Sequence, residues 1–306
     1  MNYETLYNNI QAYSENFEPL FIASIPVFVQ EAEDRIYNSV QIPSLRKNVT
    51  GTLSISNPYV SLPDDWLSNY SFAVIDPTGR YNYLLNKDVN FIREAYPTPT
   101  STGLPQHYAL FGSQLNNVNE MTLIVGPTPD QNYTVEMHYF YYPPTIVQGQ
   151  ITLANLTSQG SLYANGAYQN VPLTGGSGQN ATADIVIVGN VVTSCTIKFG
   201  GQFYVAGDIL SADPTTLGGS GSGFTVTVSQ VSNTTGTSWL GDNFDPVLFY
   251  GAMREAMLYM RQEQDVVASY EQKYQEALGM LKRLGDGLER GDAYRDGQTR
   301  LQYNTL

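Results

Sequence analysis

The feature that most restricts the fold is a segment of 89 residues, 148–236, which contains only four charged side chains and 15 of the 27 glycines. Within it, residues 183–188 and 191–198 are rich in β-branched side chains, and Gly189-Asn190 joins them. Such runs favour strands, and a Gly-Asn pair between two of them is typical of a tight hairpin. We therefore predict an all-β insertion domain over 148–236. A flexible linker is the alternative explanation of its Gly-Ser runs.

Two further features support strands in this segment. The sequence Phe-Gly-Gly-Gln-Phe at residues 199–203 is a candidate for a second hairpin. The Gly-Ser run at 218–223 leads into a stretch at 224–228 in which apolar and polar residues alternate, as in a half-buried strand.

Helical periodicity precedes the glycine-rich segment. Leu6, Ile10 and Tyr13 are spaced to share one face of a helix. A second helix is predicted over 26–41, because Pro26 suits a first turn, where a missing N–H costs nothing. An apolar stripe then follows on that helix, formed by Phe28, Ala32, Ile36 and Val40.

Helical periodicity returns after residue 236. Residues 246–262 carry an apolar stripe that includes three methionines, and residues 265–284 carry a second stripe. Gly285 is expected to end the last helix, since glycine is the usual residue just beyond a helix C-terminus. The remaining residues, 285–306, show little apolar periodicity and are predicted to be an extended C-terminal tail.

The residues between the N-terminal helices and the glycine-rich segment are predicted to be short strands. Asp76-Pro77-Thr78-Gly79 is a β-turn sequence between two strand-like runs. A short helix capped by Asn86 is expected over 86–96. Three more strands are expected, at 107–111, 121–125 and 133–142. Sequential strands with tight turns indicate an antiparallel meander that closes, or nearly closes, as a small barrel or sandwich.

The predicted fold class is therefore α+β. A helical bundle is split between residues 1–44 and 237–284, and an antiparallel β domain at 45–147 lies between its halves in the sequence. The all-β insertion domain (148–236) and the extended tail (285–306) complete the chain.

The charge of the chain excludes some functions. Asp and Glu number 28 against 15 Lys and Arg, a formal net charge of −13, although only 14% of residues are charged. An acidic protein repels phosphates and anionic lipids, so DNA binding through counterion release and membrane association are not expected. No apolar run approaches the roughly 20 residues that a bilayer requires, and the opening residues do not resemble a signal peptide. The single cysteine, Cys195, excludes intrachain disulfides.

No catalytic chemistry is indicated by the sequence, and no enzyme activity, cofactor or metal site is predicted. The two histidines, His107 and His138, lie in strand-like runs and are expected to be hydrogen-bonded sheet residues. The glycine-rich loops lack the lysine of a phosphate-binding loop. Asp64-Asp65 can be read as a glycosidase acid pair, but capping of a helical turn is the simpler explanation. The tyrosine-rich stretch at 139–142 is either a sugar-stacking platform or, more simply, a barrel wall or subunit interface.

Several stretches resemble a known family. They are VFVQEAEDRIYNSV at 27–40, LRKNVTGTL at 45–53, LLNKDVNFIREAY at 84–96, VGPTPD at 125–130, VEMHYFYYP at 135–143 and the end of the chain at 270–295. These stretches resemble head-to-tail adaptor (connector) proteins of tailed bacteriophages, of the tail-tubular-A type found in short-tailed phages. The resemblance covers about 1–147 and 237–306, and leaves out 148–236, which is similar to glycine-rich β modules inserted into many phage structural proteins.

The resemblance implies a structural virion protein, made in the host bacterial cytoplasm, that forms a homo-oligomeric ring of twelve subunits. In that family the ring lies beneath the portal protein, and viral DNA passes through it during ejection. The helical bundle faces the portal, and the β part faces the tail tube or nozzle protein, with a tail fibre as a further partner. A C-terminal extension reaches onto the portal.

Carried over to this chain, the extension corresponds to 285–306. The portal contacts expected first are Tyr294, Arg295, Arg300 and Leu301. Arg35, Arg46, Tyr139 and Tyr141 are the candidate subunit-interface residues. The alternative hypothesis is a tail, receptor-binding or carbohydrate-binding structural component, for which the tyrosine-rich strands and the 148–236 segment are the motivation.

Overall fold

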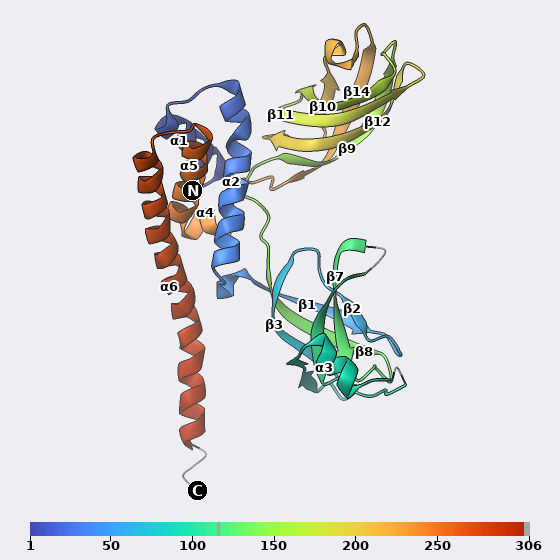
Figure 1. The fold of residues 1–306 in the computed structure, drawn as a ribbon, viewed down its shortest axis with the longest axis vertical. Helices are drawn as coiled ribbons and strands as arrows, with labels where there is room; N and C mark the ends of the chain where they lie inside the picture. Colours follow the sequence, from blue (N-terminus) through green and yellow to red (C-terminus); the bar gives the residue numbers. More distant parts are fainter. Residues whose placement is uncertain (99, 115–116, 303–306) are drawn as a thin grey trace. The chain divides into compact units, whose positions relative to one another are not determined.

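The computed structural model describes the backbone of residues 1–98, 100–114 and 117–302, and the side chains of these residues except 114–120 and 286–302. The fold is α+β, as predicted (Figure 1). The chain divides into two compact units. The first, which we call the helix–barrel unit, contains residues 1–40 and 144–284; the second, the two-sheet unit, contains residues 41–143 together with those from 285 on.

The helix–barrel unit contains the first two helices and the last three. They are α1 (Tyr3–Ser14), α2 (Pro19–Ser39), α4 (Trp239–Asn243), α5 (Asp245–Tyr259) and α6, which begins in this unit and spans Gln264–Gln302. Asn2 caps α1 by accepting a hydrogen bond from the N–H of Thr5 at 2.9 Å. Leu6 and Ile10 are buried as their spacing predicts, whereas Tyr13 is 63% exposed. Helix α5 packs against both α1 and α2, so segments from the two ends of the sequence share one core.

Helix α2 begins earlier than the sequence predicts. It starts at Pro19, and Pro26 lies inside it, not in its first turn. An internal proline removes a helical hydrogen bond and typically costs ~3 kcal/mol. Here Phe21 and Ile25, on the turn before Pro26, are fully buried. Burial of such side chains contributes ~1.5–3 kcal/mol each, which offsets the cost of Pro26.

Helix α6 extends beyond the predicted end. Gly285 does not end it, and the helix continues to Gln302, so the segment expected as an extended tail is helical over most of its length (Figure 1). Gly285 has no positive φ, which a glycine that ends a helix usually adopts. A glycine inside a helix costs only ~1 kcal/mol, and the following residues include Leu, Glu, Arg and Ala, which favour helix.

The two-sheet unit consists of two four-stranded sheets. The first has the order β1-β8-β3-β4 and the second the order β2-β7-β6-β5. The strands are β1 (Arg46–Leu53), β2 (Tyr59–Ser61), β3 (Trp66–Ile75), β4 (Tyr81–Tyr83), β5 (Leu85–Asn86), β6 (His107–Gln114), β7 (Asn117–Gly126) and β8 (Tyr133–Tyr141). Among the described strands of these sheets, the pairs are antiparallel except β5 with β6. Phe72, Leu123 and Val135, among others, form a common core for the two sheets.

Two short helices accompany these sheets. A 3₁₀ helix (Pro43–Leu45) precedes β1, and α3 (Val89–Ala95) follows β5. The short helix is thus found where the sequence predicts it, but its cap is Asp88, not Asn86. The Asp88 carboxylate accepts a hydrogen bond from the N–H of Asn90 at 2.7 Å.

The glycine-rich segment forms a six-stranded, nearly closed barrel in the helix–barrel unit. Its order is β12-β11-β10-β13-β14-β9. The strands are β9 (Gln150–Ser161), β10 (Gly166–Gly175), β11 (Gln179–Val188), β12 (Val191–Gln202), β13 (Ile209–Ala212) and β14 (Ser222–Ser232), with a 3₁₀ helix at Pro214–Leu217. The terminal strands of the order, β12 and β9, approach so closely that a Cβ on Gly200 would lie 2.6 Å from the carbonyl oxygen of Ile151. Gly200 therefore allows the barrel to close.

One predicted hairpin in the barrel is confirmed and one is wrong. Gly189 and Asn190 both have positive φ and join β11 to β12, as a tight hairpin turn requires. Residues 199–203 do not form a hairpin, because Phe199 to Gln202 are the last residues of β12 itself. The two glycines there allow neighbouring strands to come close to β12: Gly200 faces β9, and Gly201 faces the backbone of β11.

The barrel contacts the helices of its own unit through polar groups. The hydroxyl of Tyr3 on α1 donates to the buried carboxamide of Gln202 at the end of β12. Gln30 on α2 donates to Gln150 on β9 at 2.9 Å. In the part of the chain that the structure describes, no helix is both long enough and apolar enough to cross a membrane.

Candidate functional site

The predicted interface residue Arg46 lies on the two-sheet unit, in a cluster of aromatic rings. Its guanidinium carbon is 3.7 Å from the centre of the Tyr70 ring and 4.9 Å from that of Phe140. Arg46 and Phe140 are directly paired across β1 and β8, so their side chains share one face of the sheet. Tyr70 is 53% exposed. The cluster is a cation–π surface of the kind that is frequent in protein interfaces.

Tyr139 and Tyr141 belong to a second cluster, around Lys47 and Asp65. Lys47 follows Arg46 in β1, and consecutive strand residues point to opposite faces. Its ammonium group lies 2.5 Å from the Asp65 carboxylate and 4.1 Å from the centre of the Tyr141 ring. The Tyr139 hydroxyl donates to Asp65 at 2.9 Å, and burial, together with this carboxylate, raises the pKa of Tyr139 to about 12. Tyr139 is only 3% exposed, so it has little surface for a partner to contact. Its role is to orient the Asp65 carboxylate through their hydrogen bond.

Arg35 belongs to the helix–barrel unit and is part of an ion-pair network. Its guanidinium lies 2.9 Å from Glu255 and 3.9 Å from Glu271. Arg254 pairs with the same two carboxylates. The network thus joins α2, α5 and α6, and Arg35 also lies over the ring of Tyr274. Because Arg35 remains 37% exposed, it has both an internal structural role and surface available to another molecule.

The four portal-contact residues predicted at the C-terminus all lie in α6, but their side chains lie outside the described residues. They are Tyr294, Arg295, Arg300 and Leu301.

Glu33 is a buried charged residue that the sequence analysis did not single out. Its carboxylate, 3% exposed, accepts hydrogen bonds from the Thr145 hydroxyl at 2.6 Å and the Ile146 N–H at 2.9 Å. Burial raises its pKa from 4.5 to about 7, although these hydrogen bonds act in the opposite direction. The sequence contains a sign of this burial: Glu33 lies four residues after Val29 and four before Tyr37, so it shares the buried face of α2 with them.

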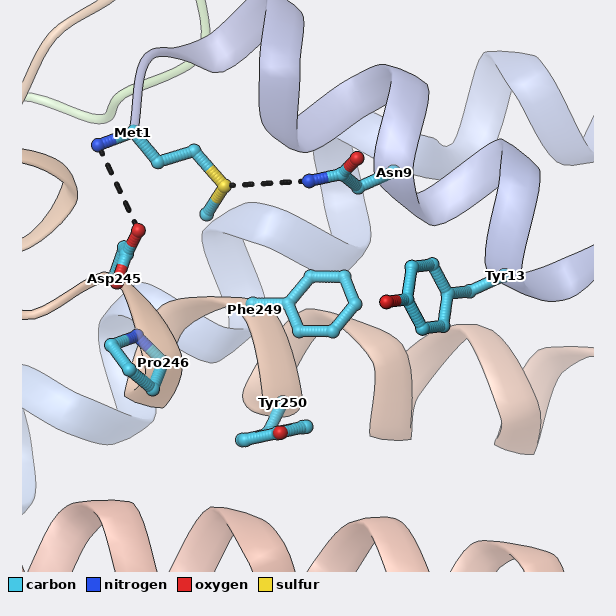
Figure 2. Close-up of a pocket in the computed structure, with 7 residues that line it drawn as sticks. All are labelled: Met1, Asn9, Tyr13, Asp245, Pro246, Phe249 and Tyr250. Carbon is cyan, nitrogen blue, oxygen red and sulfur yellow. Dashed lines mark hydrogen bonds and ion pairs between the residues drawn. The ribbon is translucent and has the colours of Figure 1, made fainter.

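A recess of about 290 Å³ lies between α1 and α5, and Figure 2 shows the side chains that line it. The rings of Tyr13 and Phe249 meet edge to face in its lining, with ring centres 5.2 Å apart. The amino group of Met1 lies 4.0 Å from the Asp245 carboxylate, and Asn9 donates to the Met1 sulfur. Its lining offers aromatic surface and one paired carboxylate, an arrangement that suits contact with another molecule better than proton transfer.

The histidines have the structural roles predicted for them. His107 lies in β6 with its Nδ1 3.1 Å from the hydroxyl of Tyr96, and His138 lies in β8 with its Nε2 3.0 Å from Glu136. Among the described residues there is no group of three or more His, Cys, Asp or Glu side chains placed to hold a metal ion. In the acid pair Asp64-Asp65, the Asp65 carboxylate forms an ion pair with Lys47 and accepts a hydrogen bond from Tyr139.

Comparison with known families gives one match. Residues 1–172 match the model of the SU10 adaptor protein family. The matched region includes α1, α2, all of the β strands of the two-sheet unit and the start of the barrel. None of the curated protein sequences matches the chain. Since the family match extends over more than half of the 306 residues, the chain belongs to the SU10 adaptor protein family, a family of bacteriophage structural proteins.

Proposed function

We propose that this chain is a head-to-tail adaptor of the virion, which forms a ring beneath the portal protein and connects it to the tail. The observation that carries this proposal is the family match over residues 1–172. The aromatic and cationic surface at Arg46, Tyr70 and Phe140 supports it, because such clusters are frequent where subunits meet. The tail tube or nozzle protein is the proposed partner on the other side of the ring.

The proposed roles of the parts follow the domain boundaries expected from the sequence. The helices of 1–44 and 237–284 form the portal-side body, and 45–147 forms the tail-side body. The glycine-rich barrel of 148–236 is an added domain, and 285–306 is the portal contact. Helix α6 supports the last role: at 1.5 Å per residue, its part from Gly285 to Gln302 spans about 27 Å, enough to reach a neighbouring protein.

The acidity of the chain suits a DNA conduit. Each subunit carries a formal charge of −13, so a ring of twelve would carry on the order of −150. A channel lined by part of this charge repels the phosphates of DNA, and the genome is not retained as it passes.

Co-sedimentation of the purified chain with portal rings from the same phage tests the proposal. We expect the chain to sediment with the portal at about one copy per portal subunit. A chain that remains in the supernatant at all concentrations would reject the position beneath the portal and favour a tail or receptor-binding component.

The role of the C-terminal residues is tested with two variants of equal charge. The double variant Arg295→Gln/Arg300→Gln removes two of the proposed portal contacts, and Lys282→Gln/Arg283→Gln removes two exposed cations earlier in α6. We expect the first to lose portal association and the second to retain it. Equal binding by both would refute the assignment of 285–306 while leaving the adaptor role intact.

A further inference from the structure

A cavity of about 480 Å³ lies within the helix–barrel unit, where α1 meets the barrel. We call it the junction pocket. One wall is formed by Glu4, Tyr7 and Asn8 of α1, and the other by barrel residues that include Gln148, Gln179 and Phe203. Its volume falls within the range of ~300–1,000 Å³ that is typical of small-molecule sites.

The two rings of the junction pocket come from different elements. Tyr7 and Phe203 meet edge to face, with ring centres 5.5 Å apart, and both remain partly exposed. Phe203 has a φ of +64°, a left-handed conformation that costs a bulky residue roughly 1–2 kcal/mol. Backbone hydrogen bonds hold it there: its N–H donates to Gln148 at 2.7 Å, and that of Tyr204 donates to Gly149 at 3.0 Å. The strained backbone therefore places this ring at the pocket.

The polar side-chain groups of the pocket are one carboxylate, three carboxamides and the hydroxyls of Tyr7 and Ser177. Glu4 and Asn8 are exposed, and within the described part of the chain neither side chain takes part in a hydrogen bond or ion pair. Gln179 donates its Nε2 hydrogens to the Tyr7 hydroxyl at 3.2 Å, and Gln148 donates to the Thr234 carbonyl at 3.1 Å. Each of these two carboxamides keeps its oxygen as an acceptor.

The positions of the two walls are fixed by a contact behind the pocket. Tyr3, one helical turn before Tyr7, is buried and donates its hydroxyl to Gln202, the residue before Phe203. The Tyr3 and Phe203 rings also pack together, with centres 5.3 Å apart. The pocket is therefore preformed, so a ligand does not have to order it, which is an advantage for affinity.

These groups select one class of ligand. The lining contains no Lys, Arg or His, and Glu4 repels anions, so phosphates, sulfates and acidic sugars are disfavoured. One carboxylate is too few for a hard divalent cation, which takes six or more oxygen ligands. The aromatic rings can stack on the C–H face of a sugar, and the carboxylate and carboxamide groups can accept hydrogen bonds from its hydroxyl groups. The lining therefore fits a neutral sugar.

We propose that the junction pocket binds an uncharged oligosaccharide, with Tyr7 and Phe203 as the stacking surface. Glu4 and Asn8 bind its hydroxyl groups. This proposal does not depend on the adaptor role, because none of the contact residues proposed for that role lines the pocket. The lining of this pocket does not include the tyrosine-rich stretch at 139–142.

A glycan array probed with the full-length chain tests the proposal, followed by calorimetric titration of the best ligand. The array includes neutral oligosaccharides and their sulfated and sialylated counterparts. Three variants remove one group each: Glu4→Gln, Asn8→Ala and Phe203→Ala. Glu15→Gln, an exposed acid at the end of α1 and outside the pocket, is the matched control for Glu4→Gln.

We expect signals on neutral glycans, a loss of affinity of about tenfold or more for each pocket variant, and unchanged binding by Glu15→Gln. Retained secondary structure, measured by circular dichroism, distinguishes loss of the ring in Phe203→Ala from unfolding. Asn8→Ala is the safeguard, because the Asn8 side chain is exposed and makes no hydrogen bond or ion pair among the described residues. An array without signals, a preference for charged glycans, or full binding by Asn8→Ala and Phe203→Ala would each overturn the proposal.

Discussion

The carboxylate of Glu33 accepts a hydrogen bond from the backbone N–H of Ile146 at 2.9 Å, in the interior of the helix–barrel unit. Thr145 donates its hydroxyl to the same carboxylate. Glu33 lies on α2, whereas Thr145 and Ile146 lie where the chain has just returned from the two-sheet unit. One buried acid thus anchors the returning chain to the N-terminal helices.

This burial makes stability depend on pH. The pKa of Glu33 is raised from 4.5 to about 7 in the folded chain by its removal from water, so the folded state keeps a proton that the unfolded state has released. Its contribution is fully present below pH ~4.5 and is lost as the pH rises to about 7, a change of about 3 kcal/mol. Glu33→Gln, which has the same shape without the charge, is expected to remove this dependence.

Denaturant unfolding of both proteins between pH 4 and 8 is the measurement. The two are expected to be similar at pH 4, with the variant progressively more stable up to about pH 7. Glu31→Gln, an exposed acid on the same helix, is the control and is expected to follow the native chain. A stability difference that does not change with pH would show that Glu33 is not protonated in the folded state.

The Arg35–Glu255 pair gives a second prediction. Glu255 is 10% exposed and faces two guanidinium groups, from Arg35 and Arg254. Glu255→Gln leaves these cations without their most buried partner and is expected to lower the free energy of unfolding by about 1–2 kcal/mol, less than for a fully buried pair. Glu276→Gln, exposed on α6, is the control. The measurement is denaturant unfolding at low and high salt, and equal stability of the two variants would contradict the network's role.

Closure of the barrel gives a third prediction. In Gly200→Ala the new methyl group would lie 2.6 Å from the oxygen and 2.8 Å from the nitrogen of Ile151, and these backbone atoms cannot move independently of β9. Forcing such strands apart is expected to cost about 1–3 kcal/mol and to lower the melting temperature. At Gly166 the atoms nearest to an added methyl group belong to the side chain of Tyr168, at 3.3 Å or more, and not to a neighbouring backbone, so Gly166→Ala is the control. Equal melting temperatures would mean that β9 and β12 do not need to touch.

The sequence predicted the parts of the fold that depend on local signals. The turn at Asp76 is one case: its carboxylate accepts from the N–H groups of Thr78 and Arg80, as the Asp-Pro-Thr-Gly sequence requires. The hairpin at Gly189-Asn190 is another. In both, a few consecutive residues determine the backbone, so no knowledge of distant contacts is needed.

The features that local sequence patterns do not reveal depend on packing between distant segments. Pro26 stays inside α2 because neighbouring residues are buried against other elements, and no local signal gives that energy. The junction pocket requires α1 and the end of β12, about 200 residues apart in sequence, to come together through Tyr3 and Gln202. Local sequence patterns therefore do not identify the residues of this pocket as a site.

The first and last strands of the barrel, β9 and β14, are neighbours, and the N–H of Gly149 donates to the carbonyl of Ser232 at 3.1 Å. Just outside them, the Asn233 carboxamide donates to the carbonyls of Thr145 and Thr237, both at 2.8 Å. The stretch that encodes the barrel can therefore be gained, lost or exchanged by recombination without changing the distance that the flanking chain must span.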